Sequence, residues 1–163
     1  MSQSMSQSYR AVDLDFFETA PIRFVNTELV RRSPEAIFAA VAEDPAGWGN
    51  WYPGFSKTGR YLSPPPHGPG SRRLVRMSGV TYDETILAWD PPKRWAFRVD
   101  KAAAPIAHAL AEDYQITPVE LGSIVQWTFA VDPRSALRRA TPLLRPMLTT
   151  LFRRAMSNLE RKI

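Results

Sequence analysis

Hydrophobic and polar residues alternate through the middle of the chain, and near its end the hydrophobic ones recur at three- and four-residue steps. A period of two is typical of strands with one buried face, and steps of three and four are typical of an amphipathic helix. The alternating region predicts strands at residues 22–31, 56–62, 71–78, 81–89, 94–101, 107–117 and 123–131. From Ser135 onward the helical pattern predicts a C-terminal helix.

Two short helices are expected after the first strand. Residues 33–35 read Ser-Pro-Glu, which combines a capping serine, a proline at the first helical position and an acid in the first turn. Trp48 and Trp51 are at helical spacing and predict a second short helix, which ends before Pro53. The aromatic cluster at Trp48, Trp51 and Tyr52 could either plug the base of the fold or form a gate at a cavity entrance.

The C-terminal pattern predicts one long amphipathic helix. Pro142 and Pro146 fall inside it and should interrupt its first part, so we expect a short helical piece, a kink, and a long helix from about Met147. The side that should face the sheet carries Leu144, Leu148, Leu151, Ala155 and Leu159.

This order of elements predicts an α+β fold in which a curved, antiparallel, seven-stranded sheet wraps around the long helix. One helix cannot fill the concave face of such a sheet, and the remaining gap is a natural ligand cavity. We expect a single domain at residues 22–163. The polar, low-complexity start of the chain lacks the apolar core of a signal peptide, so residues 1–21 are expected to be a disordered tail.

Positive charge is concentrated at the end of the chain. The 163 residues carry a net charge of +5, and residues 134–163 alone hold eight basic residues and one acid. On a helix, Arg153, Arg154 and Arg161 should lie opposite the apolar face. The simpler interpretation is a solvated outer face; the alternative is weak contact with an anionic membrane surface.

Several function classes are excluded or disfavoured. The chain has no cysteine and only two histidines, so neither a thiolate nor a transition-metal site is expected, and no cofactor is predicted. Nucleotide-binding and nucleophile-elbow motifs are absent. The paired arginines lack the interleaved aromatics of a nucleic-acid groove, so no nucleic-acid partner is expected. The absence of cysteine fits a reducing compartment, so a cytoplasmic location is expected. The protein is expected to be a monomer or a dimer.

Four stretches resemble one known superfamily. They are residues 30–55 (VRRSPEAIFAAVAEDPAGWGNWYPGF), 68–73 (GPGSRR), 82–99 (YDETILAWDPPKRWAFRV) and 122–127 (GSIVQW). Their order and spacing resemble the START/SRPBCC superfamily, the helix-grip fold of pollen allergens, and most closely its bacterial polyketide cyclase/dehydrase and lipid-transport group. The resemblance implies the fold. It implies the chemistry less directly, because the superfamily includes enzymes, carriers, receptors and co-chaperones.

Glu84 raises the question of which face of its strand it occupies. Tyr82, Glu84 and Ile86 share one face, but Trp89 falls on the other, so the apolar pattern alone does not settle the sides. The stretch resembles one in plant hormone receptors of this fold whose glutamate points into the cavity, which implies that Glu84 does the same. The alternative is a solvated Glu84 on the convex face.

Other residues are candidates for the same cavity. If Val75 and Met77 are core residues, Arg73 points inward and could pair with Glu84 or bind a ligand carboxylate. His108 and Tyr114 are an even number of residues apart, so they share a face if the strand is unbroken. His108 could then face the cavity, or it could lie partly exposed near a strand end. The full set of candidate ligand-binding residues is Glu84, Tyr82, Arg73, Trp95, Phe97, His108, Tyr114, Trp127, Leu148 and Phe152.

The sequence therefore predicts binding or transport of a small hydrophobic, lipid-like or polyketide-like ligand. One alternative is a polyketide cyclase, aromatase or dehydratase in which Glu84, Tyr82 or His108 moves protons. Another is a protein-interaction module without a ligand.

Overall fold

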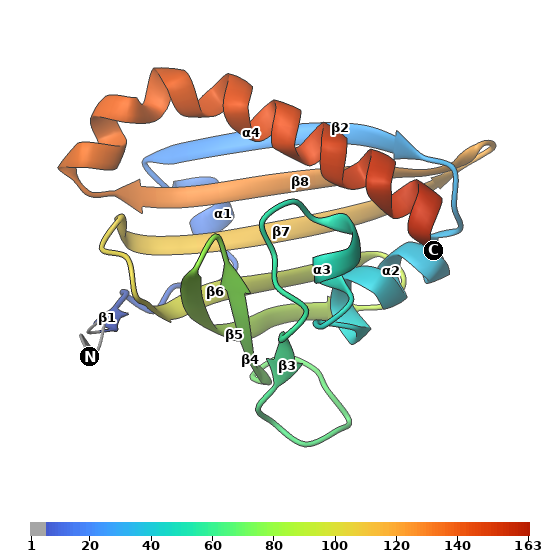
Figure 1. The fold of residues 1–163 in the computed structure, drawn as a ribbon, viewed down its shortest axis with the longest axis horizontal. Coiled ribbons are helices and arrows are strands. Elements are labelled where there is room, and N and C mark those ends of the chain that lie inside the picture. The colour runs from blue at the N-terminus through green and yellow to red at the C-terminus, as the bar shows by residue number, and fades with distance from the viewer. Residues whose placement is uncertain (1–5) are drawn as a thin grey trace.

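A curved antiparallel sheet and the long helix that crosses its concave face dominate the computed structural model, which describes residues 6–163 (Figure 1). The strand order is β2-β8-β7-β6-β5-β4-β3, so the first long strand pairs with the last. The bounds are β2 (Ile22–Val30), β3 (Arg60–Tyr61), β4 (Arg72–Met77), β5 (Val80–Asp90), β6 (Arg94–Ala102), β7 (Ala107–Val119) and β8 (Gly122–Pro133). This confirms the predicted helix-grip fold.

The strand predicted at residues 56–62 is shorter than expected. Only β3 (Arg60–Tyr61) is a regular strand, paired with β4. The Ser56 backbone N–H still donates to the Arg76 carbonyl at 2.9 Å, but a turn at residues 57–58 takes the chain out of the ladder before β3 begins.

The two short helices follow β2 as predicted. Helix α2 (Pro34–Phe38) continues into the π-helical turn η1 (Ala39–Glu43), and α3 (Trp48–Trp51) comes next. The Ser33 hydroxyl accepts a hydrogen bond from the Ala36 backbone N–H at 3.2 Å, so it caps α2 as the sequence indicated. Helix α3 is fixed to the C-terminal helix by Asn158, whose side-chain amide donates to the Trp51 carbonyl at 3.0 Å.

The aromatic cluster forms a plug and not a gate. Trp48, Trp51 and Tyr52 are all buried. The Trp48 ring lies 6.0 Å from that of Trp95 and 5.9 Å from that of Tyr114, which joins α3 to the sheet. This packing fills one end of the concave face with side chains.

Helix α4 (Ser135–Lys162) is continuous, so the predicted break before Met147 is wrong. Pro142 and Pro146 are four residues apart and both are exposed, which places the hydrogen bonds that they remove on the solvent side. The helix arches through its N-terminal half instead of breaking (Figure 1).

The C-terminal half of α4 packs closely on the sheet. Its buried residues are Phe152, Ala155, Met156 and Leu159. Arg153, Arg154 and Arg161 are exposed as predicted, and the Arg153 Nε atom contacts the Glu28 carboxylate at 3.2 Å. Membrane contact through these arginines stays a prediction.

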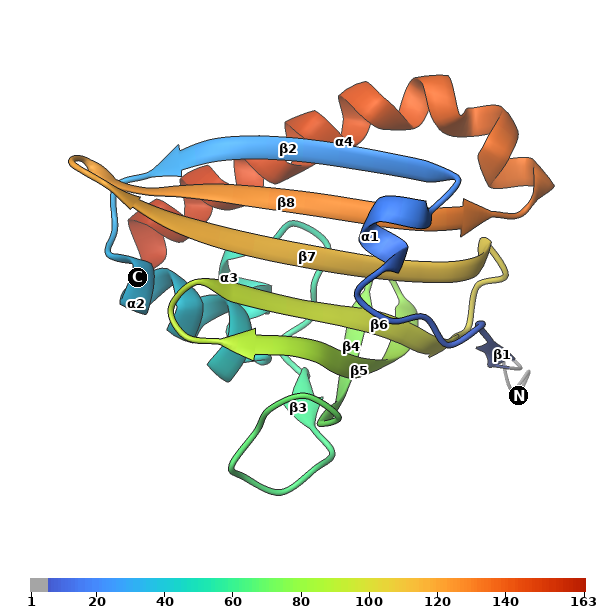
Figure 2. The same ribbon diagram turned by 180° about the vertical axis from the view of Figure 1, so that it is seen from behind.

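Residues 6–21 are packed against the domain, so the expectation of a disordered tail is wrong for them. Strand β1 (Gln7–Ser8) pairs with β6, and α1 (Phe16–Thr19) lies over the convex face of the sheet (Figure 2). Phe16 and Phe17 are buried against alanines of β6, β7 and β8. These small side chains leave an apolar surface that the two rings cover. The same expectation covered residues 1–5, which lie outside the described part of the chain.

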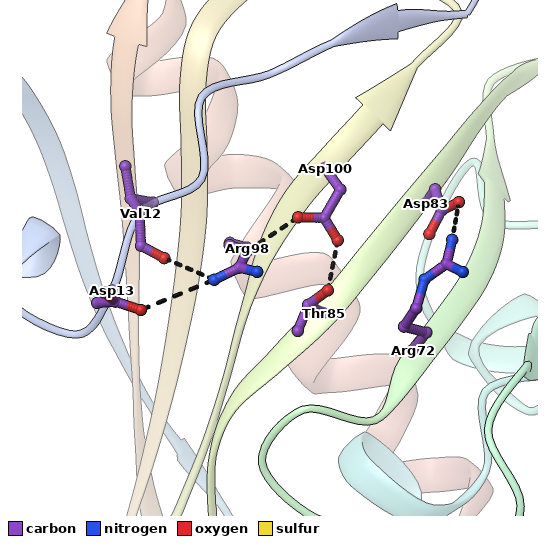
Figure 3. Close-up of polar contacts among 7 residues, drawn as sticks. All are labelled: Val12, Asp13, Arg72, Asp83, Thr85, Arg98 and Asp100. Atoms are coloured by element: carbon purple, nitrogen blue, oxygen red, sulfur yellow. Dashed lines mark hydrogen bonds and ion pairs between the residues drawn. The ribbon is translucent and has the colours of Figure 1, made fainter.

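Charged residues on the convex face are paired with one another, between neighbouring strands or along one strand (Figure 3). Arg72 contacts Asp83, and Arg98 contacts Asp100 at 2.9 Å. Arg98 also donates to the Val12 carbonyl at 3.3 Å, which holds the N-terminal segment in place. Opposite charges on the convex face therefore pair with one another at the solvent-exposed surface. The concave face, by contrast, carries few charged groups.

Candidate functional site

A cavity of about 200 Å³ lies between the concave face of the sheet and the N-terminal half of α4. Leu137, Thr141, Leu144 and Leu148 of α4 form one wall. The cavity exists because α4 arches: its C-terminal half is buried on the sheet, whereas Leu144 and Leu148 are only half-buried. Most of the opposite wall consists of apolar side chains from β2 and from β4 to β8.

Two carboxyl groups interrupt this apolar lining. Glu84 of β5 and Glu112 of β7 both line the cavity. Strand β6 lies between them, with Val99 opposite Glu84 and Phe97 opposite Glu112. Because side chains alternate between faces, this register directs both carboxyl groups to the concave side.

Arg73 lies directly behind Glu84. The two residues are opposite each other in the β4–β5 ladder, and the Arg73 Nε atom donates to Glu84 Oε2 at 2.7 Å. The Arg73 side chain is 0% exposed and the Glu84 side chain is 4% exposed. This is the geometry of a buried ion pair, in which each charge depends on the other for compensation.

Aromatic rings surround the remainder of the guanidinium. Its central carbon lies 4.6 Å from the Trp95 ring centroid, 5.0 Å from that of Trp48 and 5.2 Å from that of Phe97. The Nη1 and Nη2 atoms of Arg73 have no hydrogen-bond partner among the described residues. The stacked rings partly compensate for this, since aromatic faces attract cations.

Burial shapes the protonation of both acids. It raises the pKa of Glu84, while the charge and hydrogen bond of Arg73 oppose that rise. Burial and the neighbouring charge of Glu84 raise the pKa of Glu112 to about 8, although Trp127 opposes the shift by donating its indole N–H to Glu112 Oε1 at 2.7 Å. At neutral pH Glu112 is therefore mostly protonated, so an ion pair and a neutral acid face the same cavity.

The structure brings together only some of the residues suggested by the sequence. Tyr82, Glu84 and Leu148 line the cavity. Arg73 is inward-facing, but Glu84 separates it from the cavity. The other aromatic candidates are buried in the core and do not form the cavity wall: Trp95, Phe97, Tyr114, Trp127 and Phe152.

His108 is exposed, so the cavity position among the two left open by the sequence is wrong and the exposed position near a strand end is the one observed. The register of β7 against β8 shifts between Ala107 and Ala109, which leaves His108 without a partner in the ladder. One extra residue in a strand reverses the faces of the residues before it. His108 therefore does not share the inward face of Tyr114.

Glu112 is the site residue that sequence reasoning missed. Its position between Leu110 and Tyr114 on the same parity was the available signal, because both neighbours are apolar or aromatic and buried. A carboxyl group on the apolar face of a strand is costly and is thus a marker of function.

Two further classes of feature are absent from residues 6–163. No group of three or more potential ligands among His, Cys, Asp and Glu is arranged to hold a metal ion. None of the helices described is both long and apolar enough to cross a membrane.

Sequence comparison relates the chain to one family and to a mycobacterial relative. Residues 21–163 match the family model described as polyketide cyclase / dehydrase and lipid transport. An uncharacterized protein of Mycobacterium tuberculosis is 36% identical over 151 residues, which cover 92% of this chain and 89% of the relative.

Solved structures with low sequence identity share the fold. The ginseng major latex-like protein 151 from Panax ginseng aligns with a TM-score of 0.69 at 12% identity, over 86% of this chain and 95% of that protein. The protein CV1439 from Chromobacterium violaceum aligns with a TM-score of 0.64 at 16% identity, over 86% and 96% of the two chains. At these identities the similarity supports the fold alone.

Proposed function

The chain belongs to the polyketide cyclase/dehydrase and lipid transport family, and from that premise we propose that its cavity binds a small hydrophobic ligand. The observation that carries this proposal is the cavity itself, with apolar walls on both the sheet and α4 and two carboxyl groups between them. An enclosed apolar site with a few polar groups is the usual form of a small-molecule site.

The proposed ligand is small. A cavity of about 150 Å³ is enough for benzene, and typical ligand pockets measure about 300–1,000 Å³. At about 200 Å³, this cavity suits a molecule of about two fused rings, or a chain of similar volume.

Binding of 2-naphthol tests this proposal, because the compound is fluorescent, bicyclic and uncharged at neutral pH. Leu144 lines the cavity, whereas its neighbour Leu143 is 76% exposed on the outer side of α4. Leu144→Trp should occupy the cavity and weaken naphthol binding at least tenfold, while the matched control Leu143→Trp should leave it within twofold. Equal binding by both variants would place the probe elsewhere and contradict the proposal.

Catalysis is a second candidate, favoured by the pair of acids. Glu84 is held as the partner of Arg73 and Glu112 is mostly protonated at neutral pH, so the cavity presents a carboxylate and a carboxylic acid together. Groups of this kind could take a proton from a carbon next to a ketone and donate one to the ketone oxygen. Such proton transfers are the elementary steps of cyclase and dehydratase chemistry.

A further inference from the structure

We propose that the cavity, if it binds a ligand as proposed above, selects an uncharged molecule with a hydroxyl or carbonyl group and discriminates against ligands with an ionised carboxylate. This inference names the ligand class and therefore rests on the proposed function. It follows from the position of Arg73, the one buried cation among residues 6–163, relative to the cavity wall.

The polar side chains on the cavity wall are all acidic or neutral. Among the described residues that line it, they are Tyr82, Glu84, Glu112 and Thr141, and none is basic. A hydroxyl group of a ligand could donate to the Glu84 carboxylate or to Tyr82, and a carbonyl could accept from a protonated Glu112. A ligand carboxylate would instead face two carboxyl groups and no cation.

Arg73 cannot serve as that cation in the observed arrangement. Its Nε–H is bonded to Glu84, the rings of Trp95, Trp48 and Phe97 lie against its guanidinium, and Arg73 is not among the residues that line the cavity. The charge of Arg73 is thus compensated within the wall. Arg145, which stacks on Phe24 of the wall at 5.0 Å, is itself exposed and does not line the cavity.

Charge balance then determines the selectivity. With Glu84 and Arg73 paired and Glu112 neutral, the cavity has no net charge to match an anion. Burying an ionised carboxylate there without a partner carries a large desolvation cost, which a hydroxyl avoids by forming a hydrogen bond.

Three probes with one shared bicyclic body test this inference: 2-naphthol, naphthalene and 2-naphthoate, compared at pH 7 in competition for one site. We expect 2-naphthol to bind at least tenfold tighter than 2-naphthoate, a difference of about 1.4 kcal/mol. Naphthalene should bind more weakly than naphthol because it forms no hydrogen bond. The control Arg153→Gln, on the outer face of α4, should not change this order.

The variant Glu84→Gln/Glu112→Gln gives a sharper result because it leaves the charge of Arg73 uncompensated. Both acids are replaced because loss of the Glu84 charge beside Arg73 would lower the pKa of Glu112 and let it ionise in place of Glu84. In this variant the affinity for 2-naphthoate should rise at least tenfold, and the gain should disappear when Arg73→Gln is added. If Glu84→Gln/Glu112→Gln does not fold, the comparison of the three probes on the wild type decides.

The binding results distinguish the selectivity proposal from the ligand-binding proposal on which it rests. Naphthoate binding as tight as naphthol binding, with both lost in Leu144→Trp, would overturn the selectivity and leave the ligand-binding function standing. Failure of all three probes to bind would overturn both.

Discussion

Glu112 occupies an environment that penalises its charged form. Its pKa is raised to about 8 from an ordinary value near 4.5 by burial and by the charge of Glu84, while Trp127 and Arg73 oppose the shift. Because the folded state favours the protonated acid, the contribution of Glu112 to stability is complete below its ordinary pKa. That contribution is lost progressively as the pH rises towards 8.

The variant Glu112→Gln should therefore flatten the pH dependence of stability. Between pH 6 and pH 9, the wild type should lose about 3 kcal/mol more of its free energy of unfolding than the variant does. Urea denaturation at both pH values measures this difference. Parallel profiles for the two proteins would show that Glu112 titrates normally and is not buried as described.

The Arg73–Glu84 pair should be sensitive to the loss of one partner. Arg73→Met leaves Glu84 without compensation and should cost about 3–5 kcal/mol. Replacing both, as Arg73→Met/Glu84→Leu, should cost less than the single change, because no buried charge remains. Equal or greater loss in the double variant, measured by denaturant unfolding, would contradict the assignment of an isolated buried pair.

Proton exchange in a bicyclic ketone tests the catalytic candidate. 1-Tetralone is an uncharged bicyclic ketone, and transfer of its α-proton can be followed by NMR as exchange with deuterium in D₂O. If the cavity acts as an acid–base site, the protein should accelerate exchange, and Glu84→Gln and Glu112→Gln should each lower the acceleration about 10²-fold or more. No acceleration by the wild type would contradict the acid–base candidate for this ketone.

The alternation of side chains along a strand predicted which face some of these residues occupy and missed others, for physical reasons. Given the resemblance that set the faces of β5, parity placed Glu84 and Arg73 on the concave side, where the structure has them. Glu112 could have been found by the same reasoning. The choice between the two positions left open for His108 could not be made, because the irregularity between Ala107 and Ala109 depends on pairing with β8 and leaves no mark in the local pattern.

At the scale of elements, the arch of α4 is the feature that keeps the cavity open. Pro142 and Pro146 remove solvent-side hydrogen bonds in the half of the helix that borders the cavity. The sequence correctly identified both prolines as disruptive, but it could not distinguish a break from a bend. Whether α4 breaks or bends at the prolines depends on how its two halves pack on the sheet.

The double variant Pro142→Ala/Pro146→Ala tests this role. Alanine is favoured over proline by about 3 kcal/mol per residue inside a helix, so the variant should be more stable by at least about 1 kcal/mol. A straighter helix would also reduce the space beside Leu144, and naphthol binding should weaken. Higher stability with unchanged binding would show that the arch does not determine the cavity.

The packing of the N-terminal segment against the sheet was likewise not predictable from its local sequence. Its low-complexity start resembles a disordered tail, yet Phe16 and Phe17 find an apolar surface on the convex face. That surface is made of alanines from three strands and becomes visible only once the strands are paired.

At the scale of the whole molecule, the order of the elements was enough to predict the helix grip. One long helix opposite a seven-strand sheet leaves few alternatives, and the observed strand order agrees. The volume of the cavity was not predictable, because it depends on how much of the concave face the plug around Trp48 and the buried half of α4 already fill. That balance is a property of three-dimensional packing.

Native mass spectrometry of the protein purified from its own host is the decisive experiment for a small hydrophobic ligand in the cavity beneath α4. We expect an uncharged small molecule bound to the wild type and to Leu143→Trp, and absent from Leu144→Trp. Retention of the same molecule by Leu144→Trp, or a wild type that stays unliganded even after incubation with a small-molecule extract of the host, would contradict it.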